Sequence, residues 1–461
     1  MSAFIFEGFL STPEMLDLFG ESSVIQAMMD FEAALARAQA EEGLMPTACA
    51  QAIASVCKAD LYDLPGLIAD SRRSGSLAIP LVKKLTETVA LFDKPAAGYV
   101  HWGSTSQDVI DTGMVLVTRR ALGTIDRDLT RLVNALLGLA RAHARSPVLA
   151  RTLMQPAQVV TLGYKLLGWV APLLRAQQRL RETAARCLRL QLGGAVGTLS
   201  AMGPQGPAVA RRMAQSLGLS WSALAWHTQR DEWVALGTEL GVLCGSLGKI
   251  ARDLSLMAQG EIAELAEPSG RGRGGSSAMP HKRNPVSAMV ALAAATRAPQ
   301  RVAALLASMV QEHERGLGNW QAELAEWAGL FISTHGAVQA LAEAAEGLEV
   351  DDKRMRANIE ALQGLVSAEA VSMLLAGAMG KAGAHALMES LTHQALASGR
   401  HLREVTLEAI TRDAALSGLH DRLAPLFDVD QAAEPAARIA LEQLETLEAQ
   451  ARQLQSAPLP Y

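Results

Sequence analysis

Residues 270–285, GRGRGGSSAMPHKRNP, concentrate glycines, hydroxyls and positive charges in one short segment. The glycines let backbone N–H groups converge, the serines can donate or exchange protons, and Lys282 supplies a positive charge. A loop of this composition is suited to closing over a carboxylate. Two other interpretations fit the same residues. One is a solvated basic linker, and the other is a helix start with Asn284 as N-cap and Pro285 as first helical residue.

Residues 101–113, HWGSTSQDVIDTG, place small hydroxyl side chains and carboxylates directly before an apolar helical run. The spacing from Thr105 to Asp108 predicts a capping box at the start of a helix. Residues 150–165, ARTLMQPAQVVTLGYK, contain Arg, Thr and Gln, and on their own they indicate only the start of a helix. Because helix capping alone accounts for both segments, their polar residues are candidates for chemistry and nothing more at this stage.

Histidine lies close to arginine in two further segments, WHTQRD at 226–231 and EHERGLG at 312–318. At exposed positions such pairs are usually surface features. For the remaining histidines we expect structural roles; these are His143, His335, His385, His393, His401 and His420.

Long helices are the elements that would position these segments. Apolar residues recur at alternating steps of three and four from Trp233 to Met257, the spacing of a coiled-coil seam. Gly237, Gly241 and Gly245 form a second row without side chains, along which a neighbouring backbone can approach closely. A helix over 231–265 would be roughly 50 Å long at 1.5 Å per residue, which indicates a helix bundle. Further helices are predicted over 157–192, 285–311, 319–349 and 23–42.

The composition favours an all-α fold. Of 461 residues, 49% are hydrophobic but only 4% are aromatic, so the core consists mainly of Ala, Leu, Val and Met. Breaks at prolines and glycines divide the chain into an N-terminal helical domain over 1–108, a central long-helix bundle domain over 109–350 and a C-terminal small helical domain over 351–461.

Charge, cysteine content and hydropathy exclude several classes of protein. The 42 basic and 47 acidic residues give a net charge of −5, so nothing favours binding to nucleic acid or to an anionic membrane. Four scattered cysteines without a CxxC pair argue against disulfides and structural zinc. The first residues lack the basic start of a signal peptide, and we find no stretch of about 20 apolar residues without charges or Gly and Pro breaks. We therefore expect a cytoplasmic protein.

Three segments together resemble a known superfamily. GSSAMPHKRNP is similar to the signature loop GSSxMPxKxNP of the fumarase/aspartase superfamily, HWGSTSQDVIDTG resembles its first shared motif, and RTLMQPAQ resembles its second. The resemblance extends over essentially the whole chain, and within the superfamily the segments look most like the family of bacterial 3-carboxy-cis,cis-muconate cycloisomerases, the lactonizing enzymes of aromatic-acid breakdown.

This resemblance implies a three-domain, all-α fold in which four identical chains form a central twenty-helix bundle, with each active site built from three subunits. It implies an intramolecular lyase that adds one carboxylate of its small tricarboxylate substrate across a double bond, giving 4-carboxymuconolactone, without a metal or organic cofactor. The reaction belongs to the protocatechuate branch of the beta-ketoadipate pathway for the catabolism of aromatic compounds.

The resemblance also implies roles for particular residues. Ser276 matches the proton-transfer serine of the superfamily, and Lys282 and His101 are the other candidate catalytic residues. The candidate substrate-binding residues are Thr105, Ser106, Gln155, Arg230, Ser277, Asn284 and Arg315.

One departure from the superfamily pattern carries information. Many elimination lyases have THxQ in the second motif, with a histidine that acts in acid/base catalysis, whereas this chain has Leu153 there. Some cycloisomerases carry a histidine close by, where this chain has Pro156. The proton donor therefore stays open among Ser276, Lys282 and His101. The alternatives are a cycloisomerase for another substituted muconate such as 4-sulfomuconate, a fumarate-releasing lyase such as adenylosuccinate lyase, and a catalytically silent structural relative.

Overall fold

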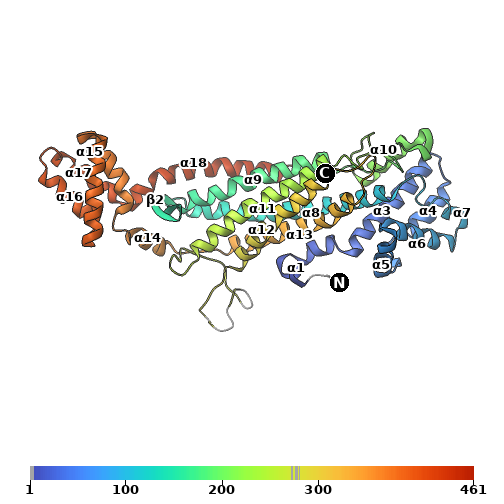
Figure 1. Cartoon of the computed structure of the whole chain (residues 1–461), viewed down its shortest axis with the longest axis horizontal. Helices are drawn as coiled ribbons and strands as arrows, with labels where there is room; N and C mark the ends of the chain where they lie inside the picture. The colour runs from blue at the N-terminus through green and yellow to red at the C-terminus, as the bar shows by residue number, and fades with distance from the viewer. Residues whose placement is uncertain (1–4, 271–273, 276–278, 280) are drawn as a thin grey trace.

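The computed structural model describes residues 5–270, 274–275, 279 and 281–461. The molecule is elongated, and its long helices run side by side along its long axis (Figure 1). Five of them form the central part of the chain: α8 (Ser106–Ala142), α9 (Leu162–Cys187), α11 (Asp231–Met257), α12 (Val286–Ala307) and α13 (Asn319–Glu346). The predicted all-α class and the predicted long helices are confirmed, although α11 ends at Met257 and not near residue 265.

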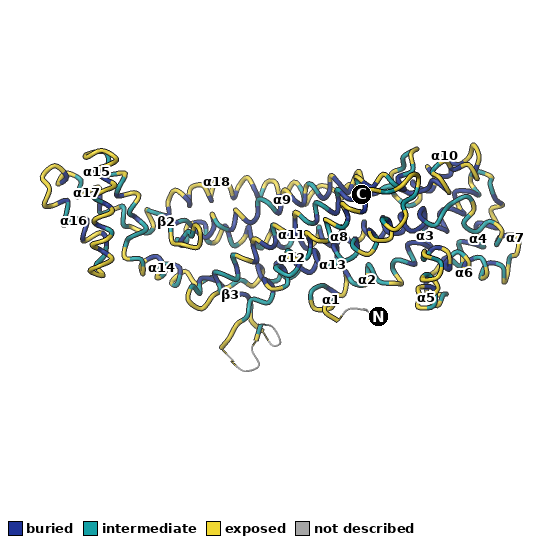
Figure 2. Tube along the Cα trace, viewed as in Figure 1, coloured by how far each residue is buried: buried dark blue, intermediate teal, exposed yellow. Residues whose placement is uncertain are grey.

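The seam predicted from Trp233 to Met257 lies in the core, since every one of its apolar residues is buried. Buried residues line the facing sides of the central helices in Figure 2. The glycine row of α11 packs against α12 within the same chain. A Cβ on Gly237 would lie 2.7 Å from Leu305, and a Cβ on Gly241 would lie 2.6 Å from Val302. By contrast, Gly245 has no neighbouring atom within 4 Å, so this position of α11 faces open space in the single chain.

The second motif folds as a β-hairpin and not as the predicted helix start. Strand β1 (Pro147–Thr152) pairs antiparallel with β2 (Gln155–Thr161), and α9 begins only after Thr161. Leu153 and Met154 form the two-residue turn with φ of 51° and 68°, the left-handed conformation that such tight hairpin turns need. The helix prediction over 157–192 was wrong at its start because β-branched residues at 159–161 favour a strand.

The N-terminal part is a cluster of shorter helices whose core is continuous with that of the bundle, since Phe31 and Leu236 belong to one connected set of buried side chains. Its helices are α1 (Ile5–Leu10), α2 (Pro13–Leu18), α3 (Glu21–Glu41), α4 (Thr47–Ser55), α5 (Leu64–Ser74), α6 (Ala78–Ala90) and α7 (Lys94–Ala97), and α10 (Gly206–Leu217) packs against α3.

The C-terminal part has its own small core, and its last helix leaves it. Helices α14 (Asp352–Glu360), α15 (Ala368–Ser398), α16 (Leu402–Arg412) and α17 (His420–Leu423) precede α18 (Val429–Ser456). α18 runs back along α9 (Figure 1), and its Leu444 and Leu447 join the core of the bundle. By packing, α18 belongs with the central helices, whereas the sequence interpretation placed it in the C-terminal domain.

Two helical segments are long and apolar enough to cross a membrane by length and composition. Both contain charged residues and glycines, so the expectation that no stretch of about 20 apolar residues lacks such breaks still holds. One is α11, which lies largely buried among the central helices. The other, Leu365–Ser398, is mostly exposed, and its helix is interrupted at Gly380, where φ is 79°.

Candidate active site

The start of α8 is fixed by a buried carboxylate. Asp108 accepts a hydrogen bond from the backbone N–H of Thr105 (3.1 Å), which closes the predicted capping box. The same carboxylate accepts the N–H groups of Gly193 (3.0 Å) and Gly194 (2.8 Å) and lies 2.7 Å from Nε2 of His227. These contacts connect the first turn of α8 to the segment around Gly193 and Gly194. They therefore fix the positions of residues 105 and 106, which carry the hydroxyls.

Arg315 reaches these hydroxyls from the segment before α13. Its Nη1 donates to Oγ1 of Thr105 (2.6 Å), its Nη2 donates to Oγ of Ser106 (3.1 Å), and its Nε lies 3.4 Å from Oε1 of Gln107. Among the described residues Arg315 forms no ion pair with a carboxylate. Three of the predicted binding residues, Thr105, Ser106 and Arg315, therefore lie together around an uncompensated positive charge, an arrangement suited to an anionic ligand.

Arg230 lies near this cluster but is enclosed. Its side chain is fully buried and stacks on the ring of Trp226, with 4.6 Å to the centroid. All its guanidinium nitrogens donate hydrogen bonds, chiefly to Asp111 (2.9 Å) and Glu323 (3.1 Å from Nε). Burial opposes its charge, but the two carboxylates prevail and raise the pKa of Arg230. The structure thus places this predicted substrate-binding residue where it joins α8, α11 and α13, with no donor left for a ligand.

His101 precedes the cluster in an unusual backbone conformation with φ of 59°. Its Nδ1 lies 2.5 Å from Oε1 of Glu32 on α3, and the hydroxyl of Ser104 lies 2.9 Å from Nδ1 and 3.2 Å from Nε2. Burial alone would lower the pKa of His101, but the carboxylates of Glu32 and Asp108 outweigh burial and raise it.

The signature loop is anchored at its second end. Arg283 forms a bidentate ion pair with Glu349 (2.8 Å for both bonds) and donates to the carbonyl of Glu267 (2.7 Å). The Glu267 carboxylate accepts the N–H groups of Ser287 (2.9 Å) and Ala288 (2.8 Å), so it caps α12 in place of the predicted Asn284. These contacts fix the end of the loop beside β3 (Leu265–Ala266) and β4 (Glu349–Val350), which pair with each other.

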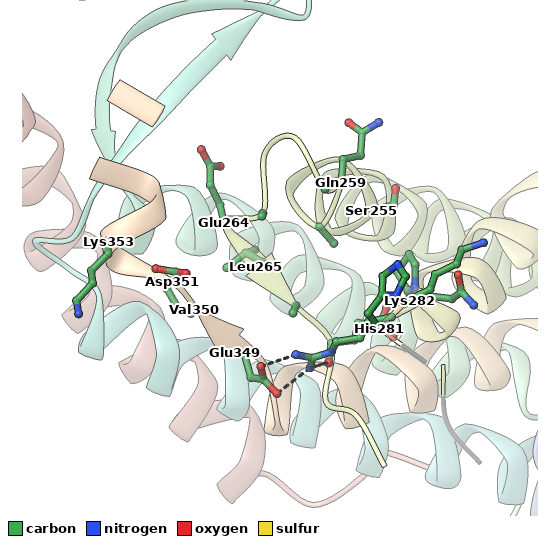
Figure 3. A pocket seen from close by; sticks show the side chains of 18 of the residues that line it. Ser255, Gln259, Glu264, Leu265, His281, Lys282, Glu349, Val350, Asp351 and Lys353 are labelled. Carbon is green, nitrogen blue, oxygen red and sulfur yellow. Dashed lines mark hydrogen bonds and ion pairs between the residues drawn. The ribbon is translucent and has the colours of Figure 1, made fainter. Parts of the chain in front are cut away.

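Lys282 and Asn284 line a cavity of about 1070 Å³ next to this anchor. Figure 3 shows Lys282 and His281 on one side of the cavity, with Asp351 and Lys353 on the other. The predicted catalytic Ser276 and its neighbour Ser277 lie outside the described residues.

Gln155 belongs neither to the Arg315 cluster nor to the described lining of this cavity. It is exposed at the tip of the hairpin, next to Leu153, which is 96% exposed. Close to the turn of the hairpin, Arg151 forms two hydrogen bonds to the buried carboxylate of Glu264 (3.0 and 2.7 Å).

The candidate residues therefore form three groups at different places in one chain. The 27 residues of α11 span about 40 Å and separate Arg230 at its start from the signature loop after its end. The 37 residues of α8 span about 55 Å and separate Ser106 from the hairpin that carries Gln155. A single chain brings His101, Thr105, Ser106 and Arg315 into one neighbourhood, but not Gln155, Lys282 or Asn284.

Sequence reasoning missed the buried carboxylates that position these groups, above all Glu32, Glu264 and Glu267. A signal for Glu32 was present, because this acidic residue falls at the spacing of the apolar residues Met28, Phe31 and Leu35 on one helix face. A charge at a core position requires a partner, although the sequence does not say which.

Comparison with known proteins decides the family. Residues 9–299 match a family model described as lyase. The chain belongs to the lyase family. Among members of this family it is 48% identical to a 3-carboxy-cis,cis-muconate cycloisomerase from Bradyrhizobium diazoefficiens, over 91% of this chain and 92% of the relative. A Pseudomonas aeruginosa protein of the same name is also 48% identical, over 92% of each chain.

The lyase fold is shared with a solved structure. The 3-carboxy-cis,cis-muconate lactonizing enzyme from Pseudomonas putida superposes with a TM-score of 0.90 at 41% identity, covering 98% of this chain and 100% of that one. The resemblance to the superfamily and to its cycloisomerases is thereby confirmed.

Proposed function

We propose that this protein is a cycloisomerase that converts 3-carboxy-cis,cis-muconate to 4-carboxymuconolactone, in the protocatechuate branch of the beta-ketoadipate pathway. The observation that carries the proposal is the 48% identity to enzymes of that name over more than nine tenths of the chain. The uncompensated charge of Arg315 beside Thr105 and Ser106 adds chemical support, because the substrate carries three carboxylates.

The reaction needs oriented donors and one proton. When a carboxylate adds to the β-carbon of a double bond, negative charge develops on the α-carbon and on the carboxylate attached to it. Donors fixed around that second carboxylate stabilise the developing charge, and removing one such donor typically costs about 2.7–4 kcal/mol. We assign substrate carboxylates to Arg315 with Thr105 and Ser106, to Lys282 with Asn284, and to Gln155 and Ser277, and we assign proton transfer to Ser276, Lys282 or His101. Arg230 acts indirectly by holding the helices in register.

We further propose that the protein works as a homotetramer in the cytoplasm, with each site drawing on three subunits. The separation of the three residue groups along helices of about 40 and 55 Å supports this proposal, since no small substrate bridges such distances. The exposed hairpin tip is a surface on which another subunit would pack.

The absence of a histidine at Leu153 favours cyclisation over elimination. An elimination that releases an amine needs a strong general acid near the leaving group, whereas lactone formation has no departing group. Leu153 cannot transfer a proton.

The test is to follow the ultraviolet absorbance of freshly prepared 3-carboxy-cis,cis-muconate with the purified protein, and to identify the product by NMR. We expect rapid loss of the conjugated diene and appearance of the 4-carboxylactone. Lys282→Met should lower kcat at least tenfold, while Lys353→Met, which changes a second lysine of the same cavity, should not. Turnover of 4-sulfomuconate alone, or release of fumarate from adenylosuccinate, would replace the proposal by one of the alternatives.

A further inference from the structure

Glu32 is a buried carboxylate whose side chain contacts one histidine, His101. Its side chain is 1% exposed in the middle of α3, and its Oε1 lies 2.5 Å from Nδ1 of His101. Its Oε2 is also shielded from solvent and has no hydrogen-bond partner among the described residues. A buried carboxylate with a single partner depends on that partner for the compensation of its charge, so the contact favours the protonated form of His101.

The backbone brings the histidine to the acid. His101 adopts a left-handed φ of 59°, which residues other than glycine seldom adopt, and the following turn is closed by a bond from the N–H of Ser104 to its carbonyl (3.3 Å). The neighbouring carbonyl of Trp102 accepts a hydrogen bond from Gln39 (2.7 Å), which lies about two turns of α3 beyond Glu32. The fold therefore maintains a strained conformation that sets the imidazole against Glu32.

The charges around the ring act in the same direction. The acidic groups that face His101 are Glu32 from α3 and Asp108 from α8, and together they raise its pKa in spite of burial. Since Nδ1 donates to Glu32, the second proton resides on Nε2. That nitrogen lies 3.2 Å from the hydroxyl of Ser104, the residue that precedes Thr105 and Ser106 in the sequence.

We propose that Glu32 is a positioning residue that keeps His101 doubly protonated and leaves its Nε2–H as the proton donor of the cyclisation. This inference rests on the proposed function, and it selects His101 from the three candidate donors. Glu32 itself touches no substrate.

A carboxylate oxygen of the substrate forms a C–O bond to the β-carbon, the π bond breaks, and its electron pair moves to the α-carbon. The α-carbon takes the proton from Nε2 of His101, which leaves a neutral imidazole. Because one of three ionised carboxylates becomes an ester, each turnover takes up one proton, and solvent returns it to the imidazole.

The first experiment measures the pair directly, without activity. In the full-length protein with isotope-labelled histidine, the resonance of His101, assigned with His101→Asn, should titrate above the ordinary value of about 6.5. Glu32→Gln should lower its pKa by at least one unit, and Glu32→Asp should lower it less. Glu41→Gln, the same change at an exposed position of the same helix, should leave it unchanged. A His101 pKa that is unchanged in Glu32→Gln overturns the proposal.

The second experiment reads the consequence in catalysis. In Glu32→Gln the alkaline limb of the kcat profile should move at least one unit to lower pH, with KM changed less than threefold, and the variant should add nothing to the loss caused by His101→Asn. A uniform fall in kcat at every pH, added in full to the His101→Asn loss, would indicate a merely structural role and overturn the proposal. If the wild type converts no muconate, the proposed function fails, while the NMR titration still decides whether Glu32 holds the proton on His101.

Discussion

Arg315 donates to the hydroxyl of Thr105 over 2.6 Å, across 210 positions of sequence, and thereby joins the segment before α13 to the first turn of α8. An arginine that meets hydroxyls in place of carboxylates retains its full attraction for an anion. The contact orients the guanidinium without neutralising it.

Replacing this arginine should weaken substrate binding. Arg315→Gln removes a charge-assisted hydrogen bond worth about 1.5–3 kcal/mol, so KM should rise roughly 10- to 100-fold. Steady-state kinetics measures the change. Arg212→Gln, at an exposed arginine that pairs with Glu42, is the control and should leave KM unaltered. An unchanged KM in Arg315→Gln would remove this residue from the binding site.

The buried ion pairs of Arg230 should contribute strongly to the free energy of unfolding. Asp111→Asn removes one of the two carboxylates that compensate Arg230 and leaves a buried charge poorly paired, at a cost of about 3–5 kcal/mol. Urea unfolding should show a clearly lower midpoint than for Asp70→Asn, which changes an exposed aspartate on α5. Equal midpoints would show that Glu323 alone suffices.

Acid should destabilise the protein through His335. This histidine lies 2.8 Å from both Asp128 and Thr12, and burial lowers its pKa against the pull of Asp128. Because its folded pKa lies below the unfolded value of about 6.5, its contribution is present above that pH and is lost as the pH falls below it. His101, with a raised pKa, contributes with the opposite sign. Urea midpoints from pH 8 to pH 5 should fall less steeply in His335→Gln than in the wild type, and parallel slopes would contradict this account.

The glycine row of α11 should respond unevenly to substitution. Gly241→Ala forces a Cβ to within 2.6 Å of Val302 and should destabilise the protein by about 1–3 kcal/mol. Gly245→Ala meets no atom of its own chain within 4 Å and should stabilise the helix by up to about 1 kcal/mol. Thermal unfolding with light scattering distinguishes the two. Loss of assembly in Gly245→Ala would instead reveal a subunit packed against that position.

Ser276→Ala tests this serine against His101 as the proton donor. It should reduce kcat at least ~100-fold only if Ser276 transfers the proton, and the unfolding midpoint should then change little, because a proton-transferring hydroxyl contributes to chemistry more than to packing. Ser255→Ala, which removes a hydroxyl from the wall of the neighbouring cavity, serves as the matched control. A near-wild-type kcat in Ser276→Ala would exclude this serine from the mechanism.

Periodicity predicted the long helices well because their apolar residues face a continuous core. The helix from Trp233 to Met257 is an example in which every apolar residue of the seam is buried. It failed at the hairpin, where the strand over 155–161 is short and the turn at Leu153 and Met154 uses left-handed conformations without glycine. Leucine and methionine are not typical of such a turn, so these residue types do not predict it.

The candidate site was predictable by resemblance but not by residue type alone. Arg315 and Arg230 are indistinguishable in sequence, yet one faces hydroxyls and the other is enclosed by two carboxylates. The difference arises from partners more than 80 positions away, such as Glu323 for Arg230, and sequence spacing does not report contacts of that range. Sequence spacing did not reveal the role of Glu32 for the same reason, because its partner His101 is 69 positions away.

The distance between the signature loop and the Arg315 cluster has a genetic consequence. If every site combines parts of different chains, a cell that expresses Lys282→Met and Arg315→Gln together will assemble some sites from two intact halves. Two inactive alleles should then restore partial growth on the aromatic precursor, although neither does so alone.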